Sequence, residues 1–217
     1  MGSSYRGPRI KAPLAGLTAL SVLVGGWLMA EGVRAQERPP RPPASAQRPP
    51  GDSPAAAAGA LALPPALPLR MRIAAIGVDT PLMGLGLLPD GTLDTPPDSA
   101  TELAGWYQDG TTPGAAGTAL TVGHLDSATG PAVFYRLGAL RRGHTVEVDR
   151  ADGRTAVFTV DAVELHEGEA FPDDRVYGRA ARPELRVITC GGDYAGPDAG
   201  YRGNTVVYAH LTGVRRS

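Results

Sequence analysis

From Leu69 to the C-terminus, the sequence is a succession of short β-rich runs separated by turn residues, and this spacing constrains the fold more than any other feature. The runs are rich in Val, Ile, Thr and Leu, and Gly191 and Gly192 are among the residues that interrupt them. No long stretch has the periodicity of an amphipathic helix, and we expect only short helices, at residues 99–106 and 131–137. Seven or eight short strands indicate a mainly β fold, either a closed barrel or a sandwich. The expected strands are residues 70–76, 78–87, 119–122, 144–149, 156–165, 185–189 and 205–211.

The size and charge of the chain narrow the class of protein. The 149 residues from Leu69 to Ser217 suit one domain, which would bury roughly two-thirds of the surface of its unfolded chain. Lys and Arg number 21 against 22 Asp and Glu, so no basic excess points to a nucleic-acid partner. Asp193 and Asp198 bring two carboxylates to one loop, which is too few for a calcium site. We predict no metal and no cofactor.

The N-terminus has the pattern of a membrane-directed segment. Arg6, Arg9 and Lys11 precede 17 uncharged, mostly apolar residues at positions 14–30. Spanning helices use roughly 17–25 apolar residues, whereas the apolar part of a cleavable signal has about 7–15. We therefore expect a cytoplasmic basic tail (1–12) and a single-pass signal-anchor (13–30), with the rest of the chain extracytoplasmic at the cell membrane. Cleavage before Gln36 is the alternative.

Residues 31–68 differ in composition from both neighbours. They are rich in Pro and Ala and contain almost nothing that builds a core. Such a sequence is typical of a semi-rigid linker. At about 3.1 Å per residue it would reach on the order of 100 Å. The linker would hold the folded domain (69–217) away from the membrane.

Cys190 is the only cysteine, and it closes the β-rich run that begins at Leu185. One cysteine cannot form an intramolecular disulfide, so the thiol is inert, intermolecular or reactive. A strand holds its last residue firmly, and Gly191 and Gly192 would then let the backbone turn away and leave the thiol accessible. The alternative is a small buried hydrophobic residue.

Two other groups suit catalysis with a thiol. His124 follows a strand-like run and a glycine, and Asp126 lies two residues on, where it would share a face with the imidazole and orient it. Arg202 stands just before another β-branched run and offers several N–H donors to an oxyanion. We expect the remaining histidines to be surface or structural residues: His144, His166 and His210.

The order of these groups resembles the sortases, cysteine transpeptidases of Gram-positive bacteria. A strand-terminal Thr-x-Thr-Cys-like motif is matched by Val187-Ile188-Thr189-Cys190, although Val187 replaces the common threonine. The upstream histidine corresponds to His124 and the downstream arginine to Arg202. The stretches at residues 132–137, 170–178, 188–192 and 201–209 look most like class F sortases of actinobacteria, with class E the nearest alternative. The similarity covers about residues 69–211.

The resemblance implies an eight-stranded sortase-type β-barrel in which the three groups converge. Cys190 would be the nucleophile, attacking the Thr–Gly bond of a Leu-Pro-x-Thr-Gly-like sorting signal on a secreted protein. His124 would protonate the leaving amine and then deprotonate the incoming one. Arg202 would hold the substrate backbone and the oxyanion. The acceptor would be an amine such as that of a cell-wall precursor or another protein.

The resemblance also implies a substrate groove beside the thiol. The loop at residues 167–183 would form one wall, and its alternative interpretation is a loop packed on its own apolar residues. We assign substrate binding to Thr189, Phe171, Val176 and Tyr177.

Three other functions remain open. An L,D-transpeptidase usually presents Ser-His-Gly-Cys, where this chain has Val-Ile-Thr-Cys. A membrane-tethered β-domain would bind peptides without catalysis, with Cys190 buried. A sortase-fold hydrolase would use water as the main acceptor.

Overall fold

The computed structural model describes residue 2 and residues 38–48, 62–168, 171–197 and 199–216. The chain divides into two compact units, Met1–Arg38 and Pro39–Ser217, and the second contains the β-domain. No helix in the described ranges is long and apolar enough to cross a membrane. The predicted signal-anchor at residues 13–30 lies outside the described residues, so it stays a prediction.

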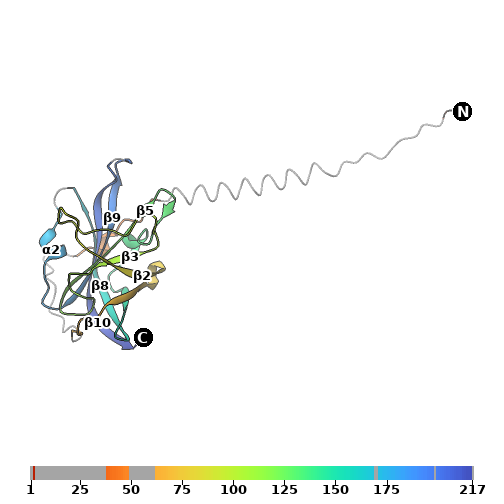
Figure 1. Ribbon diagram of the computed structural model, residues 1–217. Coiled ribbons are helices and arrows are strands. Elements are labelled where there is room, and N and C mark those ends of the chain that lie inside the picture. The colour runs from red at the N-terminus through yellow and green to blue at the C-terminus, as the bar shows by residue number, and fades with distance from the viewer. Residues whose placement is uncertain (1, 3–37, 49–61, 169–170, 198, 217) are drawn as a thin grey trace. The chain divides into compact units, whose positions relative to one another are not determined.

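Eight strands close into a barrel in the order β1-β2-β3-β4-β9-β10-β8-β7 (Figure 1). This confirms the mainly β, eight-stranded barrel. Within it, β2 pairs with β3 and β4 pairs with β9 in parallel, and the other pairings are antiparallel. A separate two-stranded ribbon joins β5 (Asp126–Ser127) and β6 (Gly130–Pro131). The barrel strands are β1 (Pro68–Ile73), β2 (Val78–Leu85), β3 (Ala104–Tyr107), β4 (Gly117–Gly123), β7 (Thr145–Arg150), β8 (Arg154–Glu167), β9 (Pro183–Tyr194) and β10 (Tyr201–Arg216).

The helices of the described chain are short. The expected helix at residues 99–106 is wrong, because its second half is the barrel strand β3. The expected helix at residues 131–137 is mostly turns that lead into the single 3-10 turn η3. The loop after β8 instead contains α2, which the sequence analysis did not anticipate. The helical segments are η1 (Ala44–Ala46), η2 (Ala74–Ile76), η3 (Leu137–Ala139) and α2 (Asp173–Tyr177).

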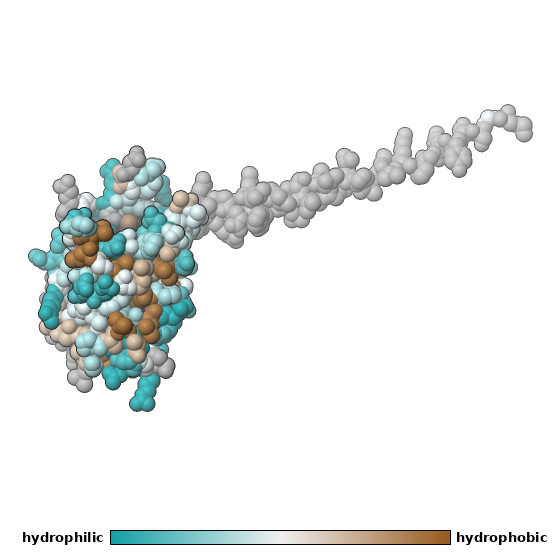
Figure 2. All heavy atoms as spheres, in the orientation of Figure 1, coloured by the Kyte–Doolittle hydropathy of each residue, from teal (hydrophilic) through white to brown (hydrophobic). Residues whose placement is uncertain are grey.

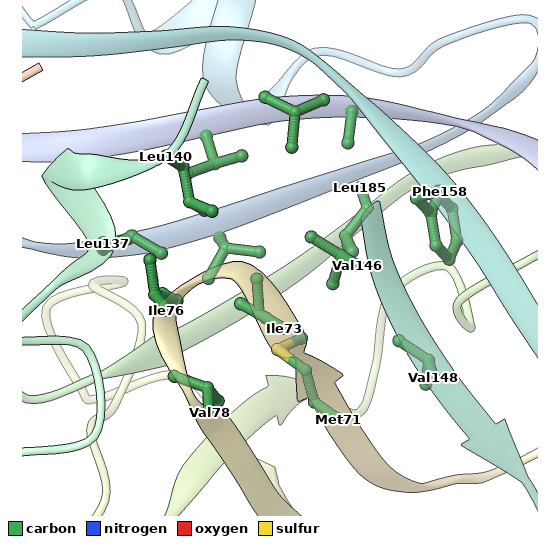
Figure 3. Close-up of a cluster of buried hydrophobic side chains, with 14 of the residues drawn as sticks. Met71, Ile73, Ile76, Val78, Leu137, Leu140, Val146, Val148, Phe158 and Leu185 are labelled. Atoms are coloured by element: carbon green, nitrogen blue, oxygen red, sulfur yellow. The ribbon is translucent and has the colours of Figure 1, made fainter. Parts of the chain in front are cut away.

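Alternation along the strands separates two apolar clusters. The larger fills the barrel interior, where Met71, Val148, Phe158 and Leu185 come together from four different strands (Figure 3). Successive strand residues point to opposite faces, so Ile188 lies on the other face of β9 from Leu185. The second cluster covers this outer face of β8, β9 and β10 and comprises Ala162, Val176, Ile188, Val206 and Tyr208, with Phe171 packed against it.

Part of the predicted linker packs against the barrel. Ala46 is fully buried in the main core, and Leu63 packs against that core while its N–H donates to the Gly114 carbonyl. The buried guanidinium of Arg150 donates to the backbone carbonyls of Pro64 and Pro113. The domain boundary at residue 69 stays a prediction, but folded contacts extend to residues before it.

On the face that Figure 2 shows, groups of apolar residues lie among hydrophilic ones. Large apolar residues exposed in the described part of the chain include Leu69, Leu87, Tyr177 and Tyr194. Scattered exposure of this kind is normal for a folded domain. Such positions provide controls for substitutions in the core.

We predict that Leu185→Ala lowers the free energy of unfolding by about 2–5 kcal/mol, because it removes a fully buried side chain and leaves a cavity in the barrel. Leu69→Ala is the matched control, since Leu69 is 52% exposed and should change stability by less than about 0.5 kcal/mol. Urea unfolding followed by circular dichroism measures both. Equal losses for the two variants would contradict the assignment of Leu185 to the core.

Candidate active site

Cys190 lies on β9, two residues beyond Ile188, and therefore points to the outer face of the barrel. It is a free and exposed thiol, which argues against its interpretation as a small buried hydrophobic residue. The strand does not end at Cys190 as expected, because β9 continues to Tyr194. Gly191 is needed for close packing, since a Cβ there would lie 2.6 Å from Oγ1 of Thr205 on β10.

Hydroxyl groups fasten β9 to its parallel neighbour β4. Thr121 Oγ1 donates to the Arg186 carbonyl at 2.9 Å, and Thr189 Oγ1 donates to the Gly123 carbonyl at 2.8 Å. Both threonines are buried. Thr189, which precedes Cys190, is therefore bonded to Gly123, which precedes His124.

The register of β4 and β9 brings His124 to the cysteine. Val122 lies opposite Ile188, and the Thr189 bond reaches Gly123, so His124 and Cys190 are the next residues on the two chains. Parallel strands end at the same edge of a sheet, and here that edge collects both reactive groups.

A backbone carbonyl group positions the imidazole of His124. Its Nε2 lies 2.6 Å from the carbonyl of Pro96 and 3.8 Å from Oδ1 of Asp98, and its side chain is 19% exposed. A carbonyl oxygen only accepts hydrogen bonds, so Nε2 carries the proton and Nδ1 is the basic nitrogen of the neutral ring. The loop at residues 96–98 was not anticipated as part of the site.

Asp126 has a different partner from the one expected. Its carboxylate accepts a short hydrogen bond from the hydroxyl of Tyr201, the first residue of β10. The contact ties the β5–β6 ribbon to the strand that carries Arg202. The role of Asp126 as orienter of His124 stays a prediction, while the structure assigns the carboxylate to Tyr201.

The electrostatic surroundings disfavour the thiolate. Desolvation by neighbouring groups raises the pKa of the Cys190 thiol, and the negative charge of Asp126 raises it further. Desolvation and the hydrogen bond to Asp126 likewise raise the pKa of Tyr201. Tyr201 therefore remains a neutral donor across the physiological range.

Arg202 lies where the pairing of β10 with β9 is irregular. The register shifts between Tyr201 and Gly203, and Asn204 is then directly opposite Cys190. The carbonyl of Arg202 accepts a hydrogen bond from Gly168 at 3.0 Å, while its side chain is exposed. The structure thus brings all three predicted catalytic residues to one end of the adjacent strands β4, β9 and β10. Asn204 was not singled out from sequence, because only the strand register places it opposite the thiol.

The predicted substrate-binding residues fall into different environments. Val176 is the buried residue of α2, whereas Tyr177 at the end of the same helix is 47% exposed, and the Phe171 ring lies 5.7 Å from that of Tyr177. Phe171 and Tyr177 therefore offer aromatic surface on α2 and the residues before it. Thr189 is buried with its hydroxyl on Gly123. Their contact with substrate stays a prediction.

A hollow beside Cys190 adds residues that the sequence analysis did not assign to the site. Leu125, Leu165 and Thr205 line it together with Gly191 and Gly192. Residues 39–42, from the predicted linker, also line it. The Pro- and Ala-rich composition of residues 31–68 did not indicate a contact with the site.

The family model of the sortase domain matches residues 71–212. The chain belongs to the sortase family. A comparison with curated proteins finds no match. Among solved structures, sortase A of Listeria monocytogenes is similar at a TM-score of 0.51 and 12% identity, covering 70% of this chain and 92% of that one. The SrtA sortase of Actinomyces oris gives 0.51 and 21% identity (70% and 88% covered), and sortase C-1 of Actinomyces oris gives 0.50 and 21% (66% and 73%).

These structures share the fold of the chain, and the family match makes it an enzyme of the sortase cysteine transpeptidase type. The likeness extends over the barrel strands that carry Cys190, His124 and Arg202, all of which lie within the matched residues. A sortase acts on the sorting signals of other proteins.

We predict that Thr189→Val destabilises the protein by about 1–3 kcal/mol, because the buried carbonyl of Gly123 loses its hydroxyl donor. Thr189→Ser keeps the hydroxyl and is the matched control, with a smaller loss from the missing methyl group. Urea unfolding of the three proteins measures the difference. A Val variant as stable as the Ser variant would show that the hydrogen bond contributes little.

We predict that Asp126→Asn lowers the pKa of Cys190, because a negative charge near the thiol disfavours the thiolate. The rate of iodoacetamide alkylation as a function of pH should shift to lower pH. Tyr201→Phe is the control: it removes the hydrogen bond but keeps the carboxylate, so the curve should not move to lower pH. An unshifted curve for Asp126→Asn would show that the carboxylate does not act on the thiol.

Proposed function

We propose that the protein is a class F sortase of actinobacterial type, with class E the nearest alternative. It cleaves the Thr–Gly bond of a Leu-Pro-x-Thr-Gly-like sorting signal and joins the acyl product to an amine at the cell surface. The observation that supports the proposal is the free, exposed thiol of Cys190, which follows Thr189 just as His124 follows Gly123, the residue that Thr189 bonds.

The reaction begins when the Cys190 thiol gives its proton to His124 and the resulting thiolate attacks the threonine carbonyl carbon. A carbon–sulfur bond forms, and the carbonyl oxygen becomes an oxyanion. The Arg202 guanidinium supplies positive charge and N–H donors to that oxygen, because Arg202 lies on β10 beside the strand that carries the thiol and its side chain is exposed. Collapse of the intermediate breaks the carbon–nitrogen bond, and protonated His124 donates its proton to the leaving amine.

The second half reverses the proton transfers. The incoming amine loses a proton to His124 and attacks the thioester carbon. The carbon–sulfur bond then breaks, which releases the new amide and regenerates Cys190. Water in place of the amine gives the hydrolase variant, and the exposure of Cys190 lets water reach the thioester.

The raised pKa of Cys190 predicts slow turnover near neutral pH. Only the thiolate attacks, and an ordinary thiol, with a pKa near 8.5, is already mostly protonated there. Asp126 and desolvation lower the thiolate fraction further. The positive charge of Arg202 and of protonated His124 would oppose this effect when substrate is bound.

The substrate side chains would lie along the outer apolar surface that leads to the thiol. Ile188, on the same face of β9 as Cys190, is covered by Val176 of α2 and flanked by Phe171. Phe171 and Tyr177 are at least partly accessible, so they could contact an apolar residue of the signal. Thr189 would act indirectly, because its hydroxyl holds the carbonyl of Gly123, the residue before His124.

The site would work outside the cell. The uncharged segment at residues 14–30, with its basic flank, supports a single-pass anchor and an extracytoplasmic domain. The partners would be secreted proteins that carry a C-terminal sorting signal, and an amine acceptor such as a cell-wall precursor. This location is a proposal from the sequence alone.

We predict that the full chain, incubated with a Leu-Pro-Ala-Thr-Gly peptide and a glycine amine, forms a ligated product that mass spectrometry detects. Cys190→Ala should abolish it. His124→Ala should slow it by about 10²–10⁴-fold and Arg202→Ala by about 10²–10³-fold. His144→Ala is the matched control, since this histidine lies in a turn away from the site, and it should retain full activity.

The other outcomes separate the alternatives. Release of the glycine fragment with only hydrolysed peptide would identify the hydrolase. No cleavage of this peptide or of a Leu-Ala-x-Thr-Gly series would contradict the proposed function and favour a peptide-binding domain.

A further inference from the structure

The short helix α2 depends on contacts with the barrel for its position. It has only five residues, and Pro172 at its N-terminal cap makes no side-chain hydrogen bond. Isolated helices shorter than about 12–15 residues are marginal in water. Val176 supplies the buried apolar contact of α2. After the helix, the Thr118 hydroxyl of β4 donates to the Gly178 carbonyl at 2.7 Å and accepts from the N–H of Ala180 at 3.1 Å. The strands therefore determine where α2 lies.

An ion pair joins α2 to β8. Nη2 of Arg175 lies 2.5 Å from Oε1 of Glu164. The Glu164 side chain is only 11% exposed, so a carboxylate left there without its cation would be costly. Apolar contact has no preferred direction, whereas a hydrogen bond weakens steeply when its angle is poor. Val176 holds α2 against the barrel, and the pair of Arg175 and Glu164 selects one orientation of the helix.

The ring of Tyr208 supports this ion pair. Tyr208 is 1% exposed, and the guanidinium carbon of Arg175 lies 4.5 Å from the centre of its ring. Arg186, directly opposite Tyr208 on β9, lies over the same ring at 4.8 Å and donates to the Arg175 carbonyl at 3.4 Å. Each guanidinium has its own carboxylate, Glu164 for Arg175 and Glu184 for Arg186, so both cations can share one ring. The barrel thus holds the side chain and the backbone of Arg175.

His166 connects the same tyrosine to Phe171. Nε2 of His166 lies 3.0 Å from the hydroxyl oxygen of Tyr208, and its ring is nearly perpendicular to that of Phe171, with 5.8 Å between the ring centres. Burial lowers the pKa of His166, so the imidazole is mostly neutral at pH 7. The rings of Phe171 and Tyr177 are 5.7 Å apart. The accessible aromatic surface therefore rests on Tyr208 by two routes, through His166 and through α2.

This network lies on the same face of β9 as the thiol. Arg186, Ile188 and Cys190 are two residues apart along the strand, so their side chains point to the same face. A change in the position of α2 would move Phe171 and Tyr177 relative to Cys190. The orientation of the helix therefore bears on how a bound apolar side chain is placed beside the thiol.

We propose that Arg175 and Glu164 are positioning residues for the substrate groove. Their ion pair holds α2 in the orientation in which the rings of Phe171 and Tyr177 bind the leucine of a sorting signal. The inference rests on the proposed function, because the orientation of this surface matters only if an apolar residue of a substrate binds it. The pair acts through the two rings and takes no part in the chemistry at Cys190.

The variants separate loss of the ion pair from general damage. Arg175→Met removes the charge but keeps a long apolar side chain against the tyrosine ring, whereas Arg175→Lys keeps the charge. Glu164→Gln removes the other partner with little change in shape. Arg154→Met is the matched control, because Arg154 is an exposed arginine at the opposite end of β8 from Glu164.

The test compares the peptides Leu-Pro-Ala-Thr-Gly and Ala-Pro-Ala-Thr-Gly, with the full chain and a glycine amine. We predict that Arg175→Met and Glu164→Gln raise the KM of the leucine peptide by about three- to tenfold, part of the roughly 10–200-fold by which an apolar pocket distinguishes side chains. The KM of the alanine peptide, and kcat for both peptides, should change by less than about twofold. Arg175→Lys should recover part of the loss, and Arg154→Met should match the wild type.

A purely structural role predicts a different result. Partial unfolding lowers the active fraction, which reduces kcat equally for both peptides and leaves KM as it is. The double variant of Arg175→Met and Glu164→Gln should be no worse than either single variant, because both changes break the same contact. An equal loss for the two peptides, or additive effects in the double variant, would overturn the positioning role.

Amide hydrogen exchange tests the same contact without turnover. The N–H groups of Val176 and Gly178 donate to the carbonyls of Pro172 and Asp174, and they should exchange faster in Arg175→Met and Glu164→Gln than in wild type. Faster exchange in a protein that cleaves neither peptide would contradict the proposed function and still support the ion pair as the contact that positions α2. Peptide cleavage with wild-type exchange rates and unchanged KM values would overturn the positioning role and leave the proposed function standing.

Discussion

The buried hydroxyl of Thr189 donates to the carbonyl of Gly123, and the geometry of the site depends on this contact. Neighbouring parallel strands are joined by evenly spaced, slanted backbone hydrogen bonds. Side-chain hydrogen bonds between the strands add to this pairing. Here a second threonine, Thr121, makes the same kind of bond in the opposite direction. Together they fix β4 against β9, so the histidine and the cysteine leave the barrel at the same edge.

His124 and Cys190 have different electrostatic surroundings. His124 has the Pro96 carbonyl as the hydrogen-bond acceptor of Nε2, which selects its tautomer, and the carboxylate of Asp98 lies farther away, at 3.8 Å. Desolvation, and after it the negative charge of Asp126, raise the pKa of Cys190 and so favour the protonated thiol. The arrangement favours a resting enzyme with a neutral thiol, and the positive charge of Arg202 becomes useful only when an oxyanion needs it.

The barrel was predictable because its strands are short, β-branched and clearly separated. Cys190, His124 and Arg202 could be named as candidates because the sequence carries a family pattern around them, and their catalytic roles stay predictions. Strand β3 was missed because Ala104-Gly105-Trp106 has little β-branched character and pairs only in the context of β2 and β4. Contacts set by register or by packing were also out of reach. Asn204 faces Cys190 through the bulge in β10, and Asp126 meets Tyr201 across 75 residues of sequence.

Arg150 shows that the folded unit extends beyond the first strand toward the N-terminus. Its buried guanidinium donates to the carbonyls of Pro64 and Pro113 and to the carboxylate of Asp152. A recombinant protein trimmed to start at Leu69, where the β-rich pattern begins, would lose the Pro64 acceptor and also Ala46, which is fully buried in the main core. Composition marks where the strands begin, but buried contacts upstream of them belong to the same folded unit.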